Sequence, residues 1–319
     1  LILVTAEFVA LLGFTAYFGR SGGAPMQYLV AAAAPFVIFG LDRLRLVIAV
    51  VVGALGLHLL AWFSFTRSDA MLTVDTEMLN SLYAQSAVTT FGLIAASVYY
   101  AFSLAERAKA ETDAVLRNVL PDSIVERLKA NPGQAISDGF ASASILFADI
   151  TGFVALARGL GPEKTVALLN KLVSTFDALA QRHGVEKIKT IGDAYMVASG
   201  IPITRPDHVH ALANMALDML EAAETVGASA GIPIQIRIGM ASGPMMAGVI
   251  GTKKFSYDVW GDPVNLASRL ESASTPGRIL TCPECREKLG PGYTFESRGV
   301  IVVKGVGQQE AFYLTGRVK

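Results

Sequence analysis

Four long apolar stretches in the first 104 residues constrain the fold of this chain more than any other feature. A helix that crosses the hydrocarbon layer of a bilayer needs about 20 mostly apolar residues, and each stretch comes close to that length. We therefore predict an α-helical transmembrane bundle over residues 1–104. The stretches are residues 1–19, 24–41, 46–65 and 81–104.

Composition agrees with a membrane protein, because 52% of the residues are hydrophobic and only 17% are charged. Basic and acidic residues balance at 27 each, so the charge indicates no nucleic-acid partner. The chain begins at Leu1 rather than Met, and we expect its natural N-terminus, with any earlier spans, to lie upstream.

Charges between the apolar stretches predict the orientation. Residues 42–45 and 105–109 carry Arg and Lys and fall on one side if all four stretches span, whereas the acidic segment 68–80 falls on the other. The positive-inside rule then places residues 105–319 in the cytoplasm. Glu7 and His58 lie within spans, where ionisable residues are costly and mark sites. A sensing role is one alternative for each; the other is contact with water near a helix end for Glu7, and a hydrogen bond between two helices for His58.

Residues 105–134 have the pattern of a helical linker. Small and apolar residues recur at alternating steps of three and four from Val98 to Val119, which predicts a short coiled coil. Pro121 ends or kinks this helix, and "NPGQ" at 131–134 predicts a closing turn. The pattern fits a spacer, and it fits a dimerising rod that passes a signal from the membrane.

From about Ser142 the sequence alternates between strand and helix signals. Apolar "SILFADI" predicts a buried strand, and "GD" at 192–193 between two apolar runs predicts a hairpin. The β-α-β-β-α-β order fits an α+β ferredoxin-like sheet. The remaining predicted elements are helices over 162–183 and about 207–225, and a strand over 234–242.

Two acidic residues, Asp149 and Asp193, follow or separate apolar runs. The predicted topology places them at adjacent strand ends. With a backbone carbonyl such as that of Ile150, they supply the oxygen ligands that Mg²⁺ or Mn²⁺ prefers. Taken singly, each is better explained as a turn residue, and the metal site is favoured only by the two together with the sequence blocks described below. The pair Cys282 and Cys285 fits half of a zinc site or a redox motif, or ordinary thiols in a reduced compartment.

Five sequence blocks then carry a family resemblance: "FADITGF", "KTIGDAYMVASG", "IRIGMASGPMMAGVIG", "YDVWGDPVNLASRLES" and "VKGVGQQEAFYL". Together they resemble the class III nucleotidyl cyclase catalytic domain, over residues 140–316. The whole layout resembles the membrane-bound bacterial adenylate cyclases of the mycobacterial type, which carry six spans and act as homodimers in the plasma (inner) membrane. The resemblance implies conversion of ATP to 3′,5′-cyclic AMP and pyrophosphate.

The resemblance also implies a role for individual residues. Adenine offers an acceptor at N1, which suits the lysine Lys189, and an amino donor at N6, which suits the aspartate Asp258. Guanine offers the reverse pattern. The pair Lys189 and Asp258 therefore favours ATP over GTP. Arg278 is a weaker alternative to the phosphate-neutralising lysine. The implied sites are ligands for two Mg²⁺ or Mn²⁺ ions at Asp149, Ile150 and Asp193, base contacts at Lys189 and Asp258, a transition-state pair at Asn265 and Arg269, and a phosphate contact at Lys304.

In this family the metal aspartates and the Asn–Arg pair come from opposite subunits, so the expected partners are ATP, a second copy of the chain and membrane lipid. Val154 and Pro263 replace commoner threonines without touching a proposed catalytic side chain. Two alternatives are a guanylate cyclase and a membrane receptor whose cyclase-like domain only senses nucleotide. A diguanylate cyclase is disfavoured because the GG[DE]EF signature is absent from the sequence.

Overall fold

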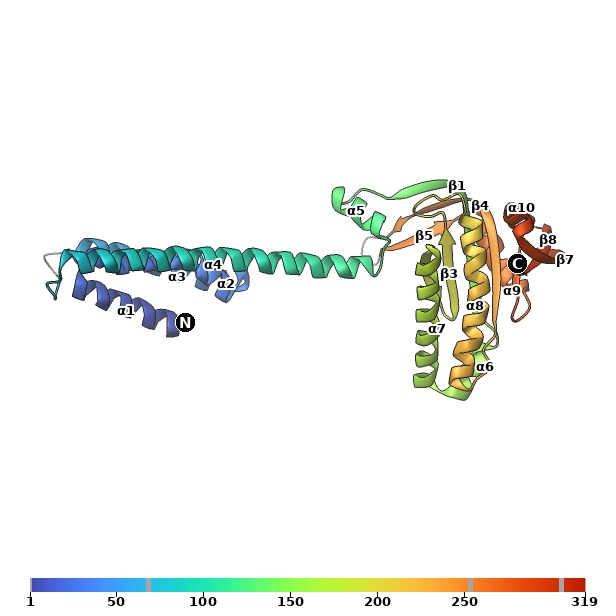
Figure 1. The fold of residues 1–319 in the computed structure, drawn as a ribbon, viewed down its shortest axis with the longest axis horizontal. Helices are drawn as coiled ribbons and strands as arrows, with labels where there is room; N and C mark the ends of the chain where they lie inside the picture. The colour runs from blue at the N-terminus through green and yellow to red at the C-terminus, as the bar shows by residue number, and fades with distance from the viewer. Residues whose placement is uncertain (1, 67–69, 252–254, 304–306, 319) are drawn as a thin grey trace. The chain divides into compact units, whose positions relative to one another are not determined.

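The computed structural model describes residues 2–66, 70–251, 255–303 and 307–318. The chain divides into two compact units, Leu1–Ala114 and Val115–Lys319. The first is helical, and the second holds the β-sheet (Figure 1).

In the helical unit, two helices are long and apolar enough to cross a membrane, Leu41–Ser64 and Thr76–Arg117. Many of their large apolar side chains, such as Val52, Phe63 and Phe91, are exposed, as expected of helices that face lipid. The elements are α1 (Ile2–Phe18), η1 (Arg20–Gly22), η2 (Ala24–Ala32), α2 (Ala34–Phe39), η3 (Leu41–Arg43), α3 (Leu44–Ser64) and α4 (Thr76–Arg117).

The second apolar stretch differs from the expectation of one spanning α-helix. It forms the 3₁₀ helix η2 and then the short helix α2. Pro35 stands at the start of α2, where a missing N–H interrupts the preceding hydrogen-bond ladder. His58 bonds the Pro25 carbonyl with its Nδ1, at 2.7 Å, which agrees with the hydrogen-bonding interpretation of this residue.

Helix α4 extends without a break into the linker and ends at Arg117. Pro121 caps the next helix, α5 (Asp122–Ala130), and the turn predicted at 131–134 is present, with Gln134 N donating to Asn131 O at 3.2 Å. Ile124 and Val125 on α5 are buried in the core of the sheet-containing unit. The linker is therefore part of that unit's packing from about Leu120 onward.

Eight strands of the described residues form one sheet in the order β2-β3-β1-β4-β6-β8-β7, with β5 paired to β4. The β-α-β-β-α-β order predicted for its first part is present. The elements are β1 (Ser137–Ile150), α6 (Phe153–Leu160), α7 (Pro162–His183), β2 (Glu186–Ile191), β3 (Ala194–Ser199), α8 (His208–Ala230), β4 (Ile236–Ile250), β5 (Ser256–Trp260), α9 (Asp262–Ala273), β6 (Ile279–Thr281), α10 (Pro283–Leu289), η5 (Gly290–Gly292), β7 (Tyr293–Val303) and β8 (Gly307–Arg317).

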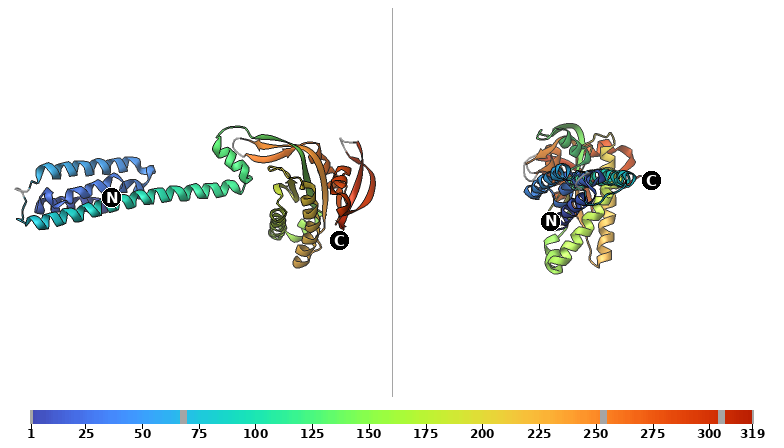
Figure 2. Two further views of the ribbon diagram at one scale, coloured as in Figure 1. Left: turned by 45° about the horizontal axis from the view of Figure 1, so that its top comes forward. Right: turned by 90° about the vertical axis from the view of Figure 1, so that its left-hand side faces the viewer.

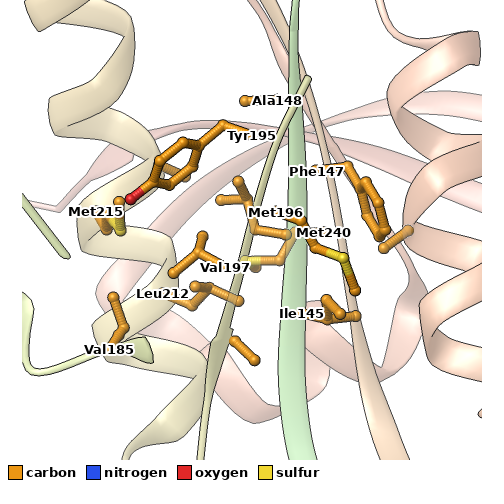
Figure 3. Packing of buried hydrophobic residues seen from close by; sticks show 14 of the residues in the cluster. Ile145, Phe147, Ala148, Val185, Tyr195, Met196, Val197, Leu212, Met215 and Met240 are labelled. Atoms are coloured by element: carbon orange, nitrogen blue, oxygen red, sulfur yellow. The ribbon is translucent and has the colours of Figure 1, made fainter. Parts of the chain in front are cut away.

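Helices cover both faces of this sheet (Figure 2). On one face, Ser144 of β1 bonds His208 of α8 at 2.8 Å. In Figure 3, Leu212 and Met215 lie on this side of the strands, and Phe147 lies on the other. Side chains alternate along a strand, so Asp149 shares the face of Phe147. Helix α9 packs on that same face, because it contacts β4 at Gly239, which pairs with Phe147.

Candidate active site

Asp149 and Asp193 lie close together at the same end of neighbouring strands. Asp149 is the next-to-last residue of β1, and Asp193 stands in the two-residue turn between β2 and β3. Strand β3 pairs antiparallel with β1, with Tyr195 opposite Ala148, so this turn lies beside the end of β1. Gly192 has a φ of 65°, which fits the first position of a type II′ turn. The predicted proximity of the two strand ends is confirmed.

Asp193 titrates abnormally in this place. Burial raises the pKa of Asp193, and the neighbouring Asp149 carboxylate raises it further, while Arg237 opposes the shift. Two carboxylates that repel each other in a partly buried place are the donor set that a divalent cation stabilises. Within the described residues, no third His, Cys, Asp or Glu completes a metal-binding group. The residues present thus fit a cation that takes its remaining ligands from a nucleotide, water or backbone carbonyls such as that of Ile150.

Arg237 is a residue of this site that the sequence patterns did not single out. It lies directly opposite Asp149 in the β1–β4 ladder, and its Nη2 donates to Asp149 Oδ2 at 2.8 Å. Its Nε is buried and has no hydrogen-bond partner among the described residues, so the guanidinium retains an unused donor. The signal was present in "IQIRIGM", where a charged residue interrupts an apolar strand in the same way as Asp149.

Lys189 and Asp258 form the second cluster. Lys189 Nζ donates to Asp258 Oδ2 at 2.5 Å, and the backbone N–H of Val259 donates to Asp258 Oδ1 at 2.9 Å. The lysine side chain is 39% exposed and the aspartate 19%. Their strands, β2 and β5, lie in different parts of the sheet path, so the fold brings together two residues whose partnership no local spacing predicts.

Asn265 and Arg269 occupy the outer face of α9. Both side chains are exposed, while Ala267 and Leu270 are buried against the sheet. The i, i+4 spacing places both on one face, as predicted. Within the described part of the chain, neither side chain has a hydrogen-bond or ion-pair partner, so the structure does not bring this pair into contact with Asp149 or Asp193 of the same chain.

Lys304 lies outside the described residues. Its alternative, Arg278, is engaged elsewhere: it pairs with Glu296, and its guanidinium carbon lies 3.8 Å from the ring centroid of Tyr313. An arginine stacked and paired in this way is poorly placed to receive a phosphate. The structure therefore offers no support for Arg278 in that role.

The cysteine pair lies at the junction of β6 and α10. Both thiols are free and buried. Hydrogen bonding to Cys285 lowers the pKa of Cys282, while burial raises that of Cys285. A closed zinc site requires four ligands. Among the described residues, no further His, Cys, Asp or Glu joins this pair to form such a group.

Comparisons with known proteins agree with this architecture. A family model of the adenylate and guanylate cyclase catalytic domain matches residues 136–316. The MASE7 model, which describes a membrane-associated sensor domain, matches residues 1–114. Both parts of the chain are thereby assigned to known domain types.

Relatives extend over the whole chain. An adenylate cyclase of Mycobacterium tuberculosis is 39% identical over 99% of this chain and 73% of its own length. The guanylate cyclase domain of RhGC from Catenaria anguillulae, in complex with GTP, is 36% identical with a TM-score of 0.55, over 57% of this chain and all of that domain.

A rhodopsin-guanylyl cyclase core with converted specificity, in complex with ATPαS, is 38% identical with a TM-score of 0.55, over 57% of this chain and 98% of that core. Nucleotidyl cyclases for both bases are therefore similar to this protein. The family, the fold and the general reliance on divalent metals follow from these matches. The chain belongs to the class III adenylate and guanylate cyclase family, with a MASE7 domain preceding the catalytic domain.

Proposed function

We propose that this nucleotidyl cyclase is a membrane-bound adenylate cyclase, which converts ATP to 3′,5′-cyclic AMP and pyrophosphate at a homodimer interface. In this reaction the 3′-oxygen of the ribose attacks the α-phosphorus, the bond to the pyrophosphate group breaks, and the 3′-hydroxyl proton is released. The observation that carries the choice of ATP is the Lys189–Asp258 pair.

This pair has the polarity that adenine requires. Lys189 supplies N–H donors for N1, and Asp258 supplies an acceptor for the N6 amino group. Without nucleotide, Lys189 and Asp258 hydrogen-bond to each other. A bound adenine would replace this hydrogen bond by two others, in which the lysine still donates and the aspartate still accepts. Guanine presents a donor at N1 and an acceptor at O6, which would leave both side chains unpaired, a mismatch that sites built on hydrogen bonds reject strongly.

The carboxylates of Asp149 and Asp193, with the Ile150 carbonyl, would hold two Mg²⁺ or Mn²⁺ ions. When bound, such ions neutralise the triphosphate and make the 3′-hydroxyl a better nucleophile. Arg237 pairs with Asp149 at 2.8 Å, which places a cationic side chain beside the proposed metal ligands. Lys304 is proposed for the terminal phosphates on the resemblance alone.

Asn265 and Arg269 would act in the active site of a second copy, with Asn265 orienting the ribose and Arg269 stabilising charge on the α-phosphate. Their exposure on α9 supports this, because side chains that complete a partner's site must be free in the single chain. The positions of the predicted coiled-coil seam are also exposed, as a dimerising seam would be before association; they are Val98, Ala101, Ala105, Ala108, Thr112, Val115 and Val119. We place the enzyme in the plasma (inner) membrane, with its catalytic domain in the cytoplasm and its MASE7 part as a sensor.

The test is cyclic nucleotide production by the purified full-length protein in detergent, with ATP or GTP and with Mg²⁺ or Mn²⁺. Cyclic AMP from the wild type, and none from Asp193→Ala, is the expected result. The similarity to guanylate cyclases makes GTP the necessary comparison, and a preference for GTP would replace the proposal with a guanylate cyclase. A dimeric protein that makes neither product would refute the enzyme and favour a nucleotide sensor.

A further inference from the structure

Glu271 is a buried carboxylate that the proposed chemistry does not use. It lies on α9 with a relative exposure of 8%, two residues after Arg269. Residues two apart point to different sides of a helix, so Arg269 faces outward while Glu271 faces the sheet. Carboxylates are rarely this buried without a partner, and its partners explain its place.

The main partner is Arg237, which Glu271 shares with the proposed metal site. Arg237 Nη2 lies 2.8 Å from Asp149 Oδ2 and 3.1 Å from Glu271 Oε1. The nitrogen donates a hydrogen bond to Asp149, whereas its contact with Glu271 is an ion pair, and Glu271 Oε1 has no hydrogen-bond partner among the described residues. Ser272 Oγ also donates to Glu271 Oε2 at 3.2 Å, which helps to hold the carboxylate in place.

Close packing of α9 on β4 makes this arrangement rigid. Gly239 lies two residues after Arg237 on the same strand face, and a Cβ built there would stand 2.0 Å from the backbone nitrogen of Glu271. Only a glycine allows this approach. The backbone of α9 therefore packs directly against β4, the strand that carries Arg237. This packing keeps Glu271 close to the Arg237 guanidinium.

We infer that Glu271 is a positioning residue: it holds the Arg237 guanidinium beside Asp149 and offsets its charge, and so sets the affinity of the Asp149–Asp193 site for a divalent cation. The inference rests on the proposed metal-binding role of these two aspartates. A cation that enters the site interacts with three carboxylates and one guanidinium, and charge interactions over a few ångströms are strong in a partly buried site. Loss of the Glu271 charge should weaken cation binding, and loss of the Arg237 charge should strengthen it.

The experiment measures Mn²⁺ binding to the full-length protein in detergent at pH 8 without nucleotide, from the electron paramagnetic resonance signal of free Mn²⁺. We expect Glu271→Gln to raise the Mn²⁺ dissociation constant about tenfold and Arg237→Gln to lower it about tenfold. The double variant should return close to the wild-type value. Disrupted packing alone would not make the double variant bind more tightly than Glu271→Gln, so this recovery separates a charge effect from structural damage.

Glu296→Gln is the matched control, because Glu296 pairs with Arg278 and its loss should leave Mn²⁺ binding unchanged. If Glu271→Gln does not fold, Arg237→Gln still decides, since unchanged or weaker binding there overturns the inference. Unchanged binding in Glu271→Gln, while Asp193→Asn abolishes it, overturns the inference and leaves the metal site standing. Failure of the wild type to bind Mn²⁺ overturns both.

Discussion

Lys189 on β2 donates a hydrogen bond to Asp258 on β5, across 69 residues of sequence and at 2.5 Å. The two residues form a donor and an acceptor side by side, the pattern that the Watson–Crick edge of adenine complements. The contact therefore gives the base preference a structural basis that can be changed one residue at a time.

The first prediction concerns that preference. Lys189→Glu replaces the donor by an acceptor, so activity with ATP should fall by at least roughly 10²-fold, because a polar mismatch with the base replaces a matched contact. The double variant Lys189→Glu/Asp258→Asn offers the pattern for guanine and should raise the ratio of GTP to ATP turnover. Steady-state rates with both nucleotides measure this ratio. An unchanged ratio would mean that the pair does not contact the base.

The second prediction separates function from stability at the metal site. In Asp193→Asn, activity should fall by roughly 10²–10³-fold, since metal ions contribute several kcal/mol to such reactions. The metal-free Tm should stay the same or rise, because the burial of a charge, and then the proximity of Asp149, which together raise the pKa of Asp193, no longer oppose folding. Thermal unfolding with and without Mn²⁺ checks this. A fall in the metal-free Tm would indicate a structural rather than a metal-binding aspartate.

The third prediction tests the shared active site. Asp193→Ala and Arg269→Ala should each be inactive alone, because each removes one half of every site. Co-expressed at equal levels, they should restore roughly a quarter of wild-type activity, since random pairing makes about half of the dimers mixed and each has one intact site of two. Cyclic AMP assays on the co-purified chains measure this. No recovery would place both residues in one subunit's site.

The fourth prediction concerns pH and the contact between linker and sheet. Burial, and then the charge of Asp122 at the start of α5, raises the pKa of Glu186 on β2 from 4.5 to about 7. Because the folded-state pKa is the higher, this residue's contribution to stability is full below about pH 4.5 and is lost as the pH rises through 7. Glu186→Gln should therefore stabilise the protein at pH 8, by up to about 3 kcal/mol, with little effect at pH 4.5.

Urea unfolding of the full chain, followed by the fluorescence of Trp260 in a Trp62→Phe background, would measure this difference. Trp260 lies on β5 in the sheet-containing unit, whereas Trp62 lies in α3, so the remaining signal reports on the relevant unit. Equal effects of Glu186→Gln at both pH values would show that Glu186 keeps an ordinary pKa.

The fifth prediction concerns the close packing of α9 on β4 at Gly239. In Gly239→Ala the new methyl group would lie 2.0 Å from Glu271 N and 2.2 Å from Ala267 O, so α9 must shift. We expect a destabilisation of about 1–3 kcal/mol and lower activity, because α9 carries Asn265 and Arg269. Gly159→Ala is the control, since its methyl group would meet nothing within 4 Å and should stabilise helix α6 by about 0.5–1 kcal/mol. Wild-type stability of Gly239→Ala would contradict the close approach.

Local patterns in the sequence predicted much of this fold. The helix expected at 162–183 is α7, with the bounds predicted, because Pro162 opens it and Gly184 accepts the left-handed backbone that closes it. The hairpin around Gly192 also follows from local turn chemistry. The C-terminal strands β7 and β8 were not predicted, since their residues lack a regular alternation and their pairing is a tertiary contact.

The amino-acid sequence was enough to predict the apolar helices α3 and α4, the order of strands and helices, and the strand end at which Asp149 stands, because each of these depends on neighbours along the chain. Contacts between residues far apart in the chain had to come from the folded structure, although the family resemblance had already grouped Lys189 with Asp258. The Lys189–Asp258 contact and the place of Arg237 between Asp149 and Glu271 depend on strand register and on the close approach of α9 at Gly239. Such contacts are set by packing across the sheet, so no spacing along the chain encodes them.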